Sequence, residues 1–525
     1  MNKKVLATLL TGSLLVSATA CSASSPSPAS TTVGNHNSYA GMAAEETTAY
    51  YGDAVEGEAW EEDFNTEEYN TIKENGFMYV TQNPLSTFAA DVDTGSYCNL
   101  RRMVRGGWGL DNVVSSIRTE EMINYFDYTV DSEEDVFSVQ YSVGDCPWNK
   151  DNKLLVMTMQ ANSEINVPNE GNNFVFLIDS SGSMSSSDKL DLARESFKLL
   201  AGTLGPNDRV SIVTYSGSYE TLLEGSNDYK KICKVLDSIT AHGGTNGSGG
   251  ITAAYECATK NFIKNGNNRV IIASDGDMNL GITSQSGLVD LITQEKESGV
   301  FLTVLGFGSG NYSDANMESI ADAGNGNYFY IDSIEEAERV LCEKMKQTTV
   351  TVAKDVKFQV EFNPAVVNAY RLIGYENRVM DAVDFNNDKK DGGEVGSGHT
   401  VVALYEIIPV GAQSAIDLKY QQVESSAVDT GSDDFATIKI RYKEPDEDKS
   451  QLLTFVADKE KFTEKPSDNL AFAGLVSEFA MLLSESDYSG TIEFADIMKA
   501  YKELDYTDDY REEFYDLVRM MAKRS

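Results

Sequence analysis

Residues 174–183 read Phe174-Val175-Phe176-Leu177-Ile178-Asp179-Ser180-Ser181-Gly182-Ser183. The five apolar residues carry no polar side chain between them, which is typical of a strand that is covered on both faces of a parallel sheet. An aspartate and three serines follow at once, before a stretch with helical periodicity. Asp179, Ser181 and Ser183 are therefore expected to present three oxygen-bearing side chains on one strand-to-helix turn.

The same alternation of apolar runs and amphipathic stretches continues over residues 171–347. The predicted strands are 174–178, 209–215, 269–274, 301–306 and 328–331, with a weaker edge candidate at 219–223. The predicted helices are 189–204, 229–239, 250–262, 286–298, 316–323 and 333–346. This order predicts a doubly wound, Rossmann-like α/β domain, in which ligands bind at the carboxyl ends of the strands.

Two further polar residues stand at the same edge of this predicted sheet. Thr245 lies in the glycine-rich turn 243–247, and Asp275 ends the apolar run 270–274. Residues 179–183 alone have an alternative interpretation as a helix N-cap, since Ser and Asp are favoured there. Because Mg²⁺ prefers hard oxygen ligands, the addition of Thr245 and Asp275 favours a divalent cation site.

Asp179, Ser181, Ser183, Thr245 and Asp275 resemble the metal-ion-dependent adhesion site of von Willebrand factor A domains. The resemblance implies Mg²⁺ or Mn²⁺ as the cofactor, held directly by the two serines and, when ligand is bound, by the threonine. It implies that both aspartates act largely through water. A shell of mainly neutral hydroxyls leaves the cation under-neutralised, so the expected partner is a protein that offers a Glu or Asp side chain.

A wider resemblance covers nearly all of the chain after residue 65. Residues 83–88, 91–97 and 120–126 are similar to the N-terminal module of YfbK-like bacterial lipoproteins, and residues 370–378 and 403–406 to their C-terminal module. The resemblance implies a von Willebrand factor A domain between two flanking modules. It also implies that the last helix of that domain, 333–346, shifts to couple occupancy of the site to the flanking sandwich.

The first residues have the pattern of an export signal. Lys3 and Lys4 precede an apolar run at 5–16, and small residues lead to Cys21. This pattern predicts a lipoprotein signal at 1–20 and a lipid anchor on Cys21; the alternative is an ordinary cleaved signal with an accidental cysteine. The run is too short to span a bilayer. The expected location is the cell envelope, with the protein anchored to the membrane and its globular part outside the cytoplasm.

The composition around the α/β domain predicts several further modules. Residues 21–65, rich in Ser, Pro and acidic residues, are expected to form a disordered tether. Period-two alternation, as in residues 357–362, predicts antiparallel strands that join into one β-sandwich. The predicted modules are an N-terminal module at 66–135, mostly helical around a short strand at 86–92; sandwich strands at 136–170; a β-rich module at 348–460; and a helical segment at 461–525, with helices at 471–483, 494–504 and 510–522.

Charge and cysteine content limit the possible partners. The chain has 82 acidic and 43 basic residues and a formal charge of -39. Nucleic acid and anionic lipid surfaces are therefore poor partners, and the excess is interpreted as a solvating surface. Besides Cys21 there are five cysteines, an odd number, so at least one is expected to be unpaired within the chain.

Two other acidic motifs carry weaker predictions. Asp91 and Asp93 alternate along an extended segment, which predicts either a possible second cation site or a structural role in a turn. Residues 384–388 imitate the start of a calcium-binding EF-hand loop. Lys389 stands where that loop needs glycine and Val395 where it needs glutamate, so the match fails.

The sequence gives little support for catalysis. The chain has three histidines, and neither a GxSxG elbow nor an HExxH pair occurs in it. The prediction is a non-enzymatic adhesion or interaction module. The alternative functions are an adaptor of an ATPase, chelatase-type or envelope assembly complex and, with no nucleophile and base identified, an envelope hydrolase.

Overall fold

The computed structural model describes residues 67–524, except 68, 70–71, 110–112, 114–115, 132–134, 164–169, 280, 325, 345–346, 348–349, 391, 413–429, 446 and 464–465. Asp63–Ser525 form one compact unit. The predicted signal, the lipid anchor at Cys21 and the tether lie outside the described residues. Among the helices of the described part, none is long and apolar enough to cross a membrane.

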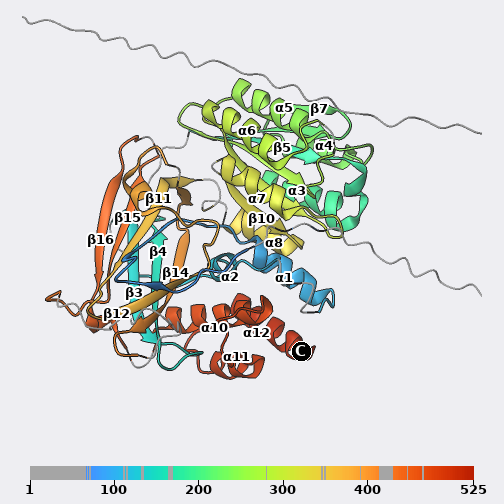
Figure 1. Cartoon of the computed structure of the whole chain (residues 1–525). Coiled ribbons are helices and arrows are strands. Elements are labelled where there is room, and N and C mark those ends of the chain that lie inside the picture. The colour runs from blue at the N-terminus through green and yellow to red at the C-terminus, as the bar shows by residue number, and fades with distance from the viewer. Residues whose placement is uncertain are drawn as a thin grey trace, which may run out of the picture. The chain divides into compact units, whose positions relative to one another are not determined.

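The central α/β domain contains a six-stranded sheet (Figure 1). Its strands, in spatial order, are β10 (Asn327–Ile331), β9 (Phe301–Phe307), β8 (Asn267–Ser274), β5 (Asn172–Asp179), β6 (Arg209–Tyr215) and β7 (Tyr219–Ser226). Neighbouring strands are parallel except for β7, which runs antiparallel at the edge. The predicted doubly wound domain, including its edge strand, is confirmed.

Helices cover both faces of this sheet. One face carries α3 (Leu192–Gly202), α4 (Tyr229–Ser238) and α8 (Ile334–Glu338), and the other carries α5 (Gly247–Lys260), α6 (Gln285–Glu295) and α7 (Asp314–Ala323). Phe174, Phe176 and Ile178 pack into the first core, whereas Val175 and Leu177 pack into the second. This division explains why residues 174–178 contain no polar side chain.

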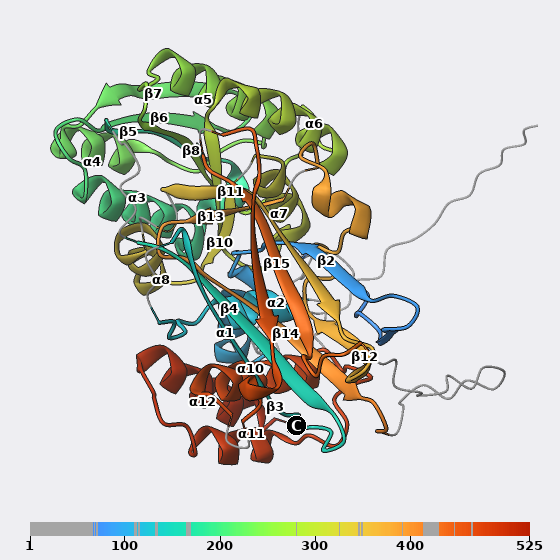
Figure 2. The ribbon, with the colours of Figure 1, turned by 90° about the vertical axis from the view of Figure 1, so that its left-hand side faces the viewer.

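Two antiparallel sheets form the β-sandwich (Figure 2). The first is β1 (Met78–Tyr79), β12 (Val367–Ile373), β14 (Thr400–Pro409), β4 (Lys153–Ala161) and β3 (Phe137–Asp145). The second is β13 (Gly393–Gly396), β11 (Thr351–Phe362), β15 (Ala436–Lys443) and β16 (Gln451–Ala457), with β2 (Leu85–Ala89) also on β11. Strands from both sides of the α/β domain pair in the first sheet, as predicted.

The N-terminal module differs from its prediction as mostly helical. Among its described residues, the α-helices α1 (Gly95–Arg105) and α2 (Thr119–Asn124) account for a minority, and β1 and β2 belong to the sandwich. Phe88 of β2 lies opposite Phe358 of β11. Because this partner lies far along the chain, local periodicity does not reveal the pairing. The prediction that the module is mostly helical was wrong.

The predicted C-terminal helices are present as α10 (Asp468–Leu483), α11 (Phe494–Tyr501) and α12 (Asp509–Met521). Phe472 and Phe479 of α10 both make edge-to-face contacts with Phe514 of α12. The described residues also form shorter helical turns: η3 (Gly182–Ser185), η4 (Ser187–Asp191), η5 (Lys296–Ser298), η6 (Arg339–Glu343), η7 (Ala382–Asn386) and η8 (Lys459–Lys461). The five cysteines of the described part are free thiols, which satisfies the prediction that at least one is unpaired.

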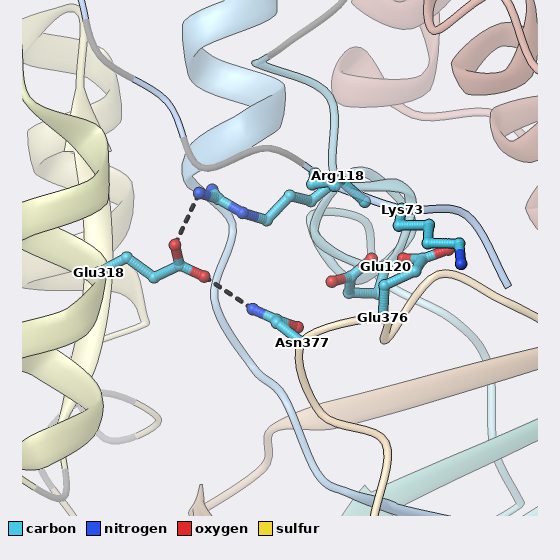
Figure 3. Close-up of a pocket in the computed structure, with 7 residues that line it drawn as sticks. Lys73, Arg118, Glu120, Glu318, Glu376 and Asn377 are labelled. Atoms are coloured by element: carbon cyan, nitrogen blue, oxygen red, sulfur yellow. Dashed lines mark hydrogen bonds and ion pairs between the residues drawn. The ribbon is translucent and has the colours of Figure 1, made fainter.

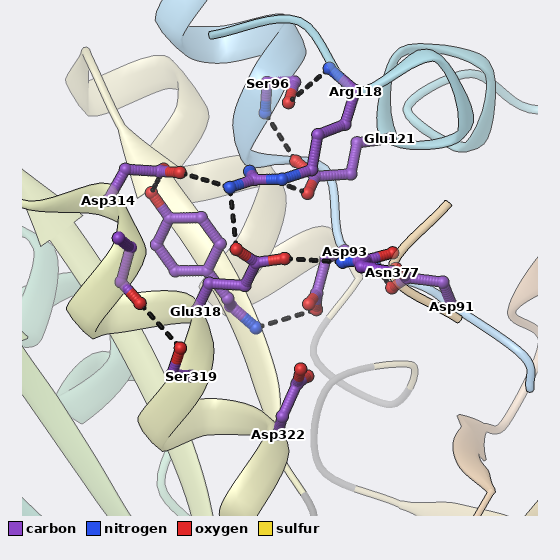
Figure 4. A network of polar contacts seen from close by, with 12 residues as sticks. Asp91, Asp93, Ser96, Arg118, Glu121, Asp314, Glu318, Ser319, Asp322 and Asn377 are labelled. Carbon is purple, nitrogen blue, oxygen red and sulfur yellow. Dashed lines mark hydrogen bonds and ion pairs between the residues drawn. The ribbon is translucent and has the colours of Figure 1, made fainter. Parts of the chain in front are cut away.

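A buried polar network joins the α/β domain to the N-terminal module (Figure 4). Arg118, directly before α2, pairs with Glu121 at 3.1 Å, Asp314 at 2.6 Å and Glu318 at 2.7 Å. Asp314 and Glu318 belong to α7, so a guanidinium of one module pairs with carboxylates of the other. All four residues are buried, which makes these ion pairs a specific joint rather than a solvated surface contact.

Candidate metal centre

Asp179 is the last residue of β5 and is completely buried. Its Oδ1 accepts a hydrogen bond from the backbone N–H of Ser181 at 2.9 Å. Its Oδ2 accepts one from the Ser274 hydroxyl, at the end of β8, at 2.8 Å. The carboxylate is therefore held in place by its own turn and by the neighbouring strand.

The two predicted serine ligands lie together in the turn 179–183. The hydroxyls of Ser181 and Ser183 are 3.0 Å apart. The backbone N–H of Gly182 donates to the carbonyl of Gly243 at 3.0 Å, which ties this turn to the loop at 240–246. Thr245 belongs to that loop and is buried, so the structure brings the second predicted element beside the first.

Asp275 follows β8 at the same edge of the sheet and is completely buried. Its Oδ2 accepts hydrogen bonds from Lys189 Nζ and from Asn311 Nδ2, both at 3.1 Å. The Lys189 side chain is buried as well and also donates to Asn311 Oδ1. Asp275 is thus positioned by a lysine from η4 and by an asparagine from the loop after β9.

Sequence reasoning missed three residues that contact the predicted ligands: Lys189, Asn311 and Asn279. Asn279 accepts a hydrogen bond from the Thr245 N–H at 2.9 Å. Each had a weak signal in the sequence. Lys189 begins the helical pattern after Ser183, and Asn279 and Asn311 follow predicted strands whose carboxyl ends share this edge. These residues surround the predicted ligands and orient them.

The electrostatics of the centre leave negative charge to be neutralised. Burial and the charge of Asp275 raise the pKa of Asp179 to about 7. Three hydroxyls and two carboxylates are the donors that the loops bring together, all of them hard oxygens of the kind Mg²⁺ selects. The donor set therefore fits the predicted cofactor, while binding of the cation remains a prediction.

The possible second cation site at Asp91 and Asp93 is filled by a guanidinium. Arg378 Nε lies 3.0 Å from Asp91 Oδ2, and Arg378 Nη2 lies 3.6 Å from Asp93 Oδ2. Asp93 Oδ1 also accepts a hydrogen bond from the backbone N–H of Tyr328 at 2.8 Å. These contacts favour the structural alternative for the two aspartates.

Among the described residues, Cys98, Asp332 and Glu336 form a cluster with metal-ligand chemistry. Arg101 Nη2 lies 2.5 Å from Asp332 and 2.8 Å from Glu336. Because Arg101 pairs with both carboxylates and Arg339 pairs with Glu336 as well, this cluster is an ion-paired joint. It ties the start of α8 to α1.

The last helix of the domain is anchored on the N-terminal module. Glu336 of α8 accepts a hydrogen bond from the Tyr125 hydroxyl at 2.9 Å, and the Arg339 guanidinium stacks 3.9 Å from the centre of the Tyr125 ring. Tyr125 directly follows α2. These contacts are with the N-terminal module, whereas the predicted shift would act on the flanking β-sandwich, and the shift itself remains a prediction.

A cavity of about 270 Å³ lies at the joint of the modules (Figure 3). Glu318 bridges its wall by accepting hydrogen bonds from Arg118 at 2.7 Å and from Asn377 at 2.7 Å. Glu120 also lines the cavity, and burial followed by the charge of Glu376 raises the pKa of its carboxyl. None of the five predicted metal ligands lines this cavity, so it is separate from the candidate centre.

Three protein-family models match the chain. Residues 174–277 match the von Willebrand factor type A domain, and residues 63–156 match a model described as von Willebrand factor. Residues 347–523 match the C-terminal region of the uncharacterised protein YfbK. The matched type A segment contains the turn 179–183, the loop 240–246 and Asp275.

Relatives cover different shares of the chain. The uncharacterised protein YfbK of Escherichia coli K12 is 38% identical over 469 residues, which cover 87% of this chain and 81% of the relative. Mouse inter alpha-trypsin inhibitor heavy chain 4 is 26% identical over 179 residues, or 32% of this chain and 19% of the relative. A solved von Willebrand factor type A protein from Catenulispora acidiphila has a TM-score of 0.41 at 14% identity, covering 75% of this chain and 91% of its own.

Proposed function

Because the chain belongs to the family of von Willebrand factor type A proteins that includes Escherichia coli YfbK, we propose that its type A domain is a cation-dependent, non-enzymatic protein-binding module. Mg²⁺ or Mn²⁺ would be held by Asp179, Ser181, Ser183, Thr245 and Asp275. When bound, the cation supplies a Lewis-acidic position for an anionic oxygen. The ligand is an Asp or Glu side chain of a protein partner.

The observation that carries this proposal is the charge balance of the centre. Asp179 and Asp275 are both buried, and Lys189 is paired to one of them at 3.1 Å. With both carboxylates ionised, these three groups sum to one negative charge. A divalent cation changes that balance to one positive charge in a buried site, where an unpaired charge is costly. A carboxylate from a partner restores neutrality.

The location of the module follows from the N-terminal sequence. Lys3, Lys4, the apolar run 5–16 and Cys21 support a processed lipoprotein. The type A domain would then be held outside the cytoplasm by a lipid on Cys21, and the partner would be an envelope or extracellular protein. Mass spectrometry of the membrane fraction tests this directly, because a Cys21→Ser variant would lose the acyl modification.

The binding mechanism is tested by affinity capture from an envelope extract. The tagged full chain serves as bait in Mg²⁺, in Mg²⁺ with excess chelator, and as the Asp179→Asn variant. Asp191→Asn is the matched control, because the Asp191 side chain is 61% exposed and forms a local ion pair with Arg194. We expect partners that are captured by wild type and by Asp191→Asn but not in the other two conditions.

Two outcomes would contradict the proposal. An identical set of captured proteins in all four conditions would eliminate the cation bridge. Recovery of ATPase subunits, with and without chelator alike, would support the adaptor alternative instead.

A further inference from the structure

A second cavity, of about 590 Å³, lies in the C-terminal helical segment, outside the type A domain. Glu478 of α10 and Ile492 line it together with Trp148, from the loop between β3 and β4. Asp496 and Lys499 of α11 and the following Glu503 also line it and are exposed to solvent. Its volume falls within the range of small-ligand sites.

Glu478 is the unusual residue of this cavity. It is 4% exposed and stands on the most buried helix of the segment, between Ser477 and Phe479. In the part of the chain that the structure describes, its carboxylate has neither a hydrogen-bond donor nor a cationic partner. Burial, followed by the charge of Asp496, raises the pKa of Glu478 to about 8. A buried carboxylate of this kind is costly unless a cation pairs with it.

The remaining walls suit a cation on an apolar stem. The Trp148 indole is partly buried, and its Nε1–H meets no acceptor among the described residues. An indole face attracts cations, and Ile492 adds an aliphatic surface. Asp496, Glu503 and Lys499 also line the cavity. Together with Glu478 it is therefore lined by three carboxylates and one ammonium.

We infer that this cavity binds a primary ammonium group on an aliphatic stem, with the ammonium at Glu478 and the stem against Trp148 and Ile492. The same chemistry occurs in a free alkylamine and in a lysine side chain of a protein. The site is independent of the candidate metal centre, since none of the metal-centre residues lines it.

The test uses calorimetric titration of the full chain with 1-aminopentane and with Nα-acetyl-L-lysine amide, and 1-pentanol serves as the uncharged control. We expect saturable binding of at least one amine and none of the alcohol. Glu478→Gln keeps the shape of the side chain but removes its charge, and it should weaken amine binding about tenfold or more. Glu512→Gln, an exposed carboxylate on α12, should leave the affinity unchanged.

Stronger binding of the acetylated lysine amide would identify a protein-borne lysine as the ligand, and stronger binding of aminopentane would identify a free amine. The inference is overturned if neither amine saturates the wild type, or if Glu478→Gln binds as well as wild type. Chelator and Asp179→Asn should leave amine binding intact. Failure of the metal-centre proposal is therefore distinguishable from failure of this one.

Discussion

Replacing Lys189 by methionine tests the charge balance of the candidate metal centre. Lys189 Nζ lies 3.1 Å from Asp275 Oδ2, and the two side chains are 5% and 0% exposed. At an effective dielectric constant of about 20, charges 3.1 Å apart attract by about 5 kcal/mol. Removing one partner of a buried pair leaves the other uncompensated, so we expect a loss of about 3–5 kcal/mol in the free energy of unfolding without metal.

The same change should strengthen cation binding. The Lys189 ammonium repels a cation that approaches Asp275, so Lys189→Met should bind Mg²⁺ at least about tenfold more tightly, a difference of about 1.4 kcal/mol. Magnesium would then offset part of the lost stability. In this variant it acts as the missing counter-charge.

The assay is urea unfolding of wild type and Lys189→Met, each with chelator and with saturating Mg²⁺. Lys198→Met is the matched control, because its carboxylate partners Glu195 and Asp237 are 58% and 61% exposed. Such exposed pairs contribute at most about 1 kcal/mol. The reasoning is refuted if Lys189→Met is as stable as wild type in chelator, or if Mg²⁺ stabilises the variant no more than it stabilises wild type.

Three further predictions concern metal linkage, the module joint and pH. Magnesium at about one hundred times its dissociation constant should raise the free energy of unfolding by about 2.7 kcal/mol, and thermal scans should show this gain disappearing in Asp179→Asn. Arg118→Met should lower the free energy of unfolding by about 3–5 kcal/mol, since three buried carboxylates lose their guanidinium. Arg519→Met is the control: its pair with Asp516 is 51% and 56% exposed, so its loss should stay below about 1 kcal/mol. The pKa of Glu478 is raised from 4.5 to about 8 in the folded state. The resulting gain in the free energy of unfolding is fully present below about pH 4.5 and is lost as the pH rises to about 8. The loss amounts to at most about 5 kcal/mol. Urea unfolding midpoints of wild type and Glu478→Gln at both pH values test this pH dependence. The prediction is contradicted if the variant loses as much stability as wild type between the two pH values.

The sequence predicted the α/β domain because its information is local. The apolar run at 174–178 and the runs that end at Tyr215 and Ser274 have the length and composition of buried parallel strands, and their order sets which loops share an edge. Asp179, Thr245 and Asp275 therefore reached one edge in the prediction as they do in the structure. Pairing of β2 with β11 is different, because its register depends on a partner in a distant segment.

The polar surroundings of the centre were beyond sequence reasoning for the same reason. Asn311 reaches Asp275 because the loop after β9 passes beside β8, and this approach is a property of the packed sheet. Lys189 is a helix-starting residue in the sequence, and only the structure shows that its ammonium is buried against that carboxylate. Local patterns thus predicted the candidate ligands but not Lys189 and Asn311, the groups that pair with the Asp275 carboxylate and orient it.

The two aspartate pairs of this chain show why acidic spacing alone does not define a cation site. Asp91 and Asp93 share the guanidinium of Arg378, whose rigid fork contacts both and also pairs with Asp322 at 2.7 Å, and Asp93 accepts a further backbone N–H. Asp179 and Asp275 have one flexible ammonium instead, and hydroxyls stand beside them in place of a guanidinium. A bidentate guanidinium both fills and orients a carboxylate pair. Where it is replaced by hydroxyls and a single lysine, oxygen donors remain for a divalent cation, and for this reason we assign the proposed binding function to Asp179 and Asp275.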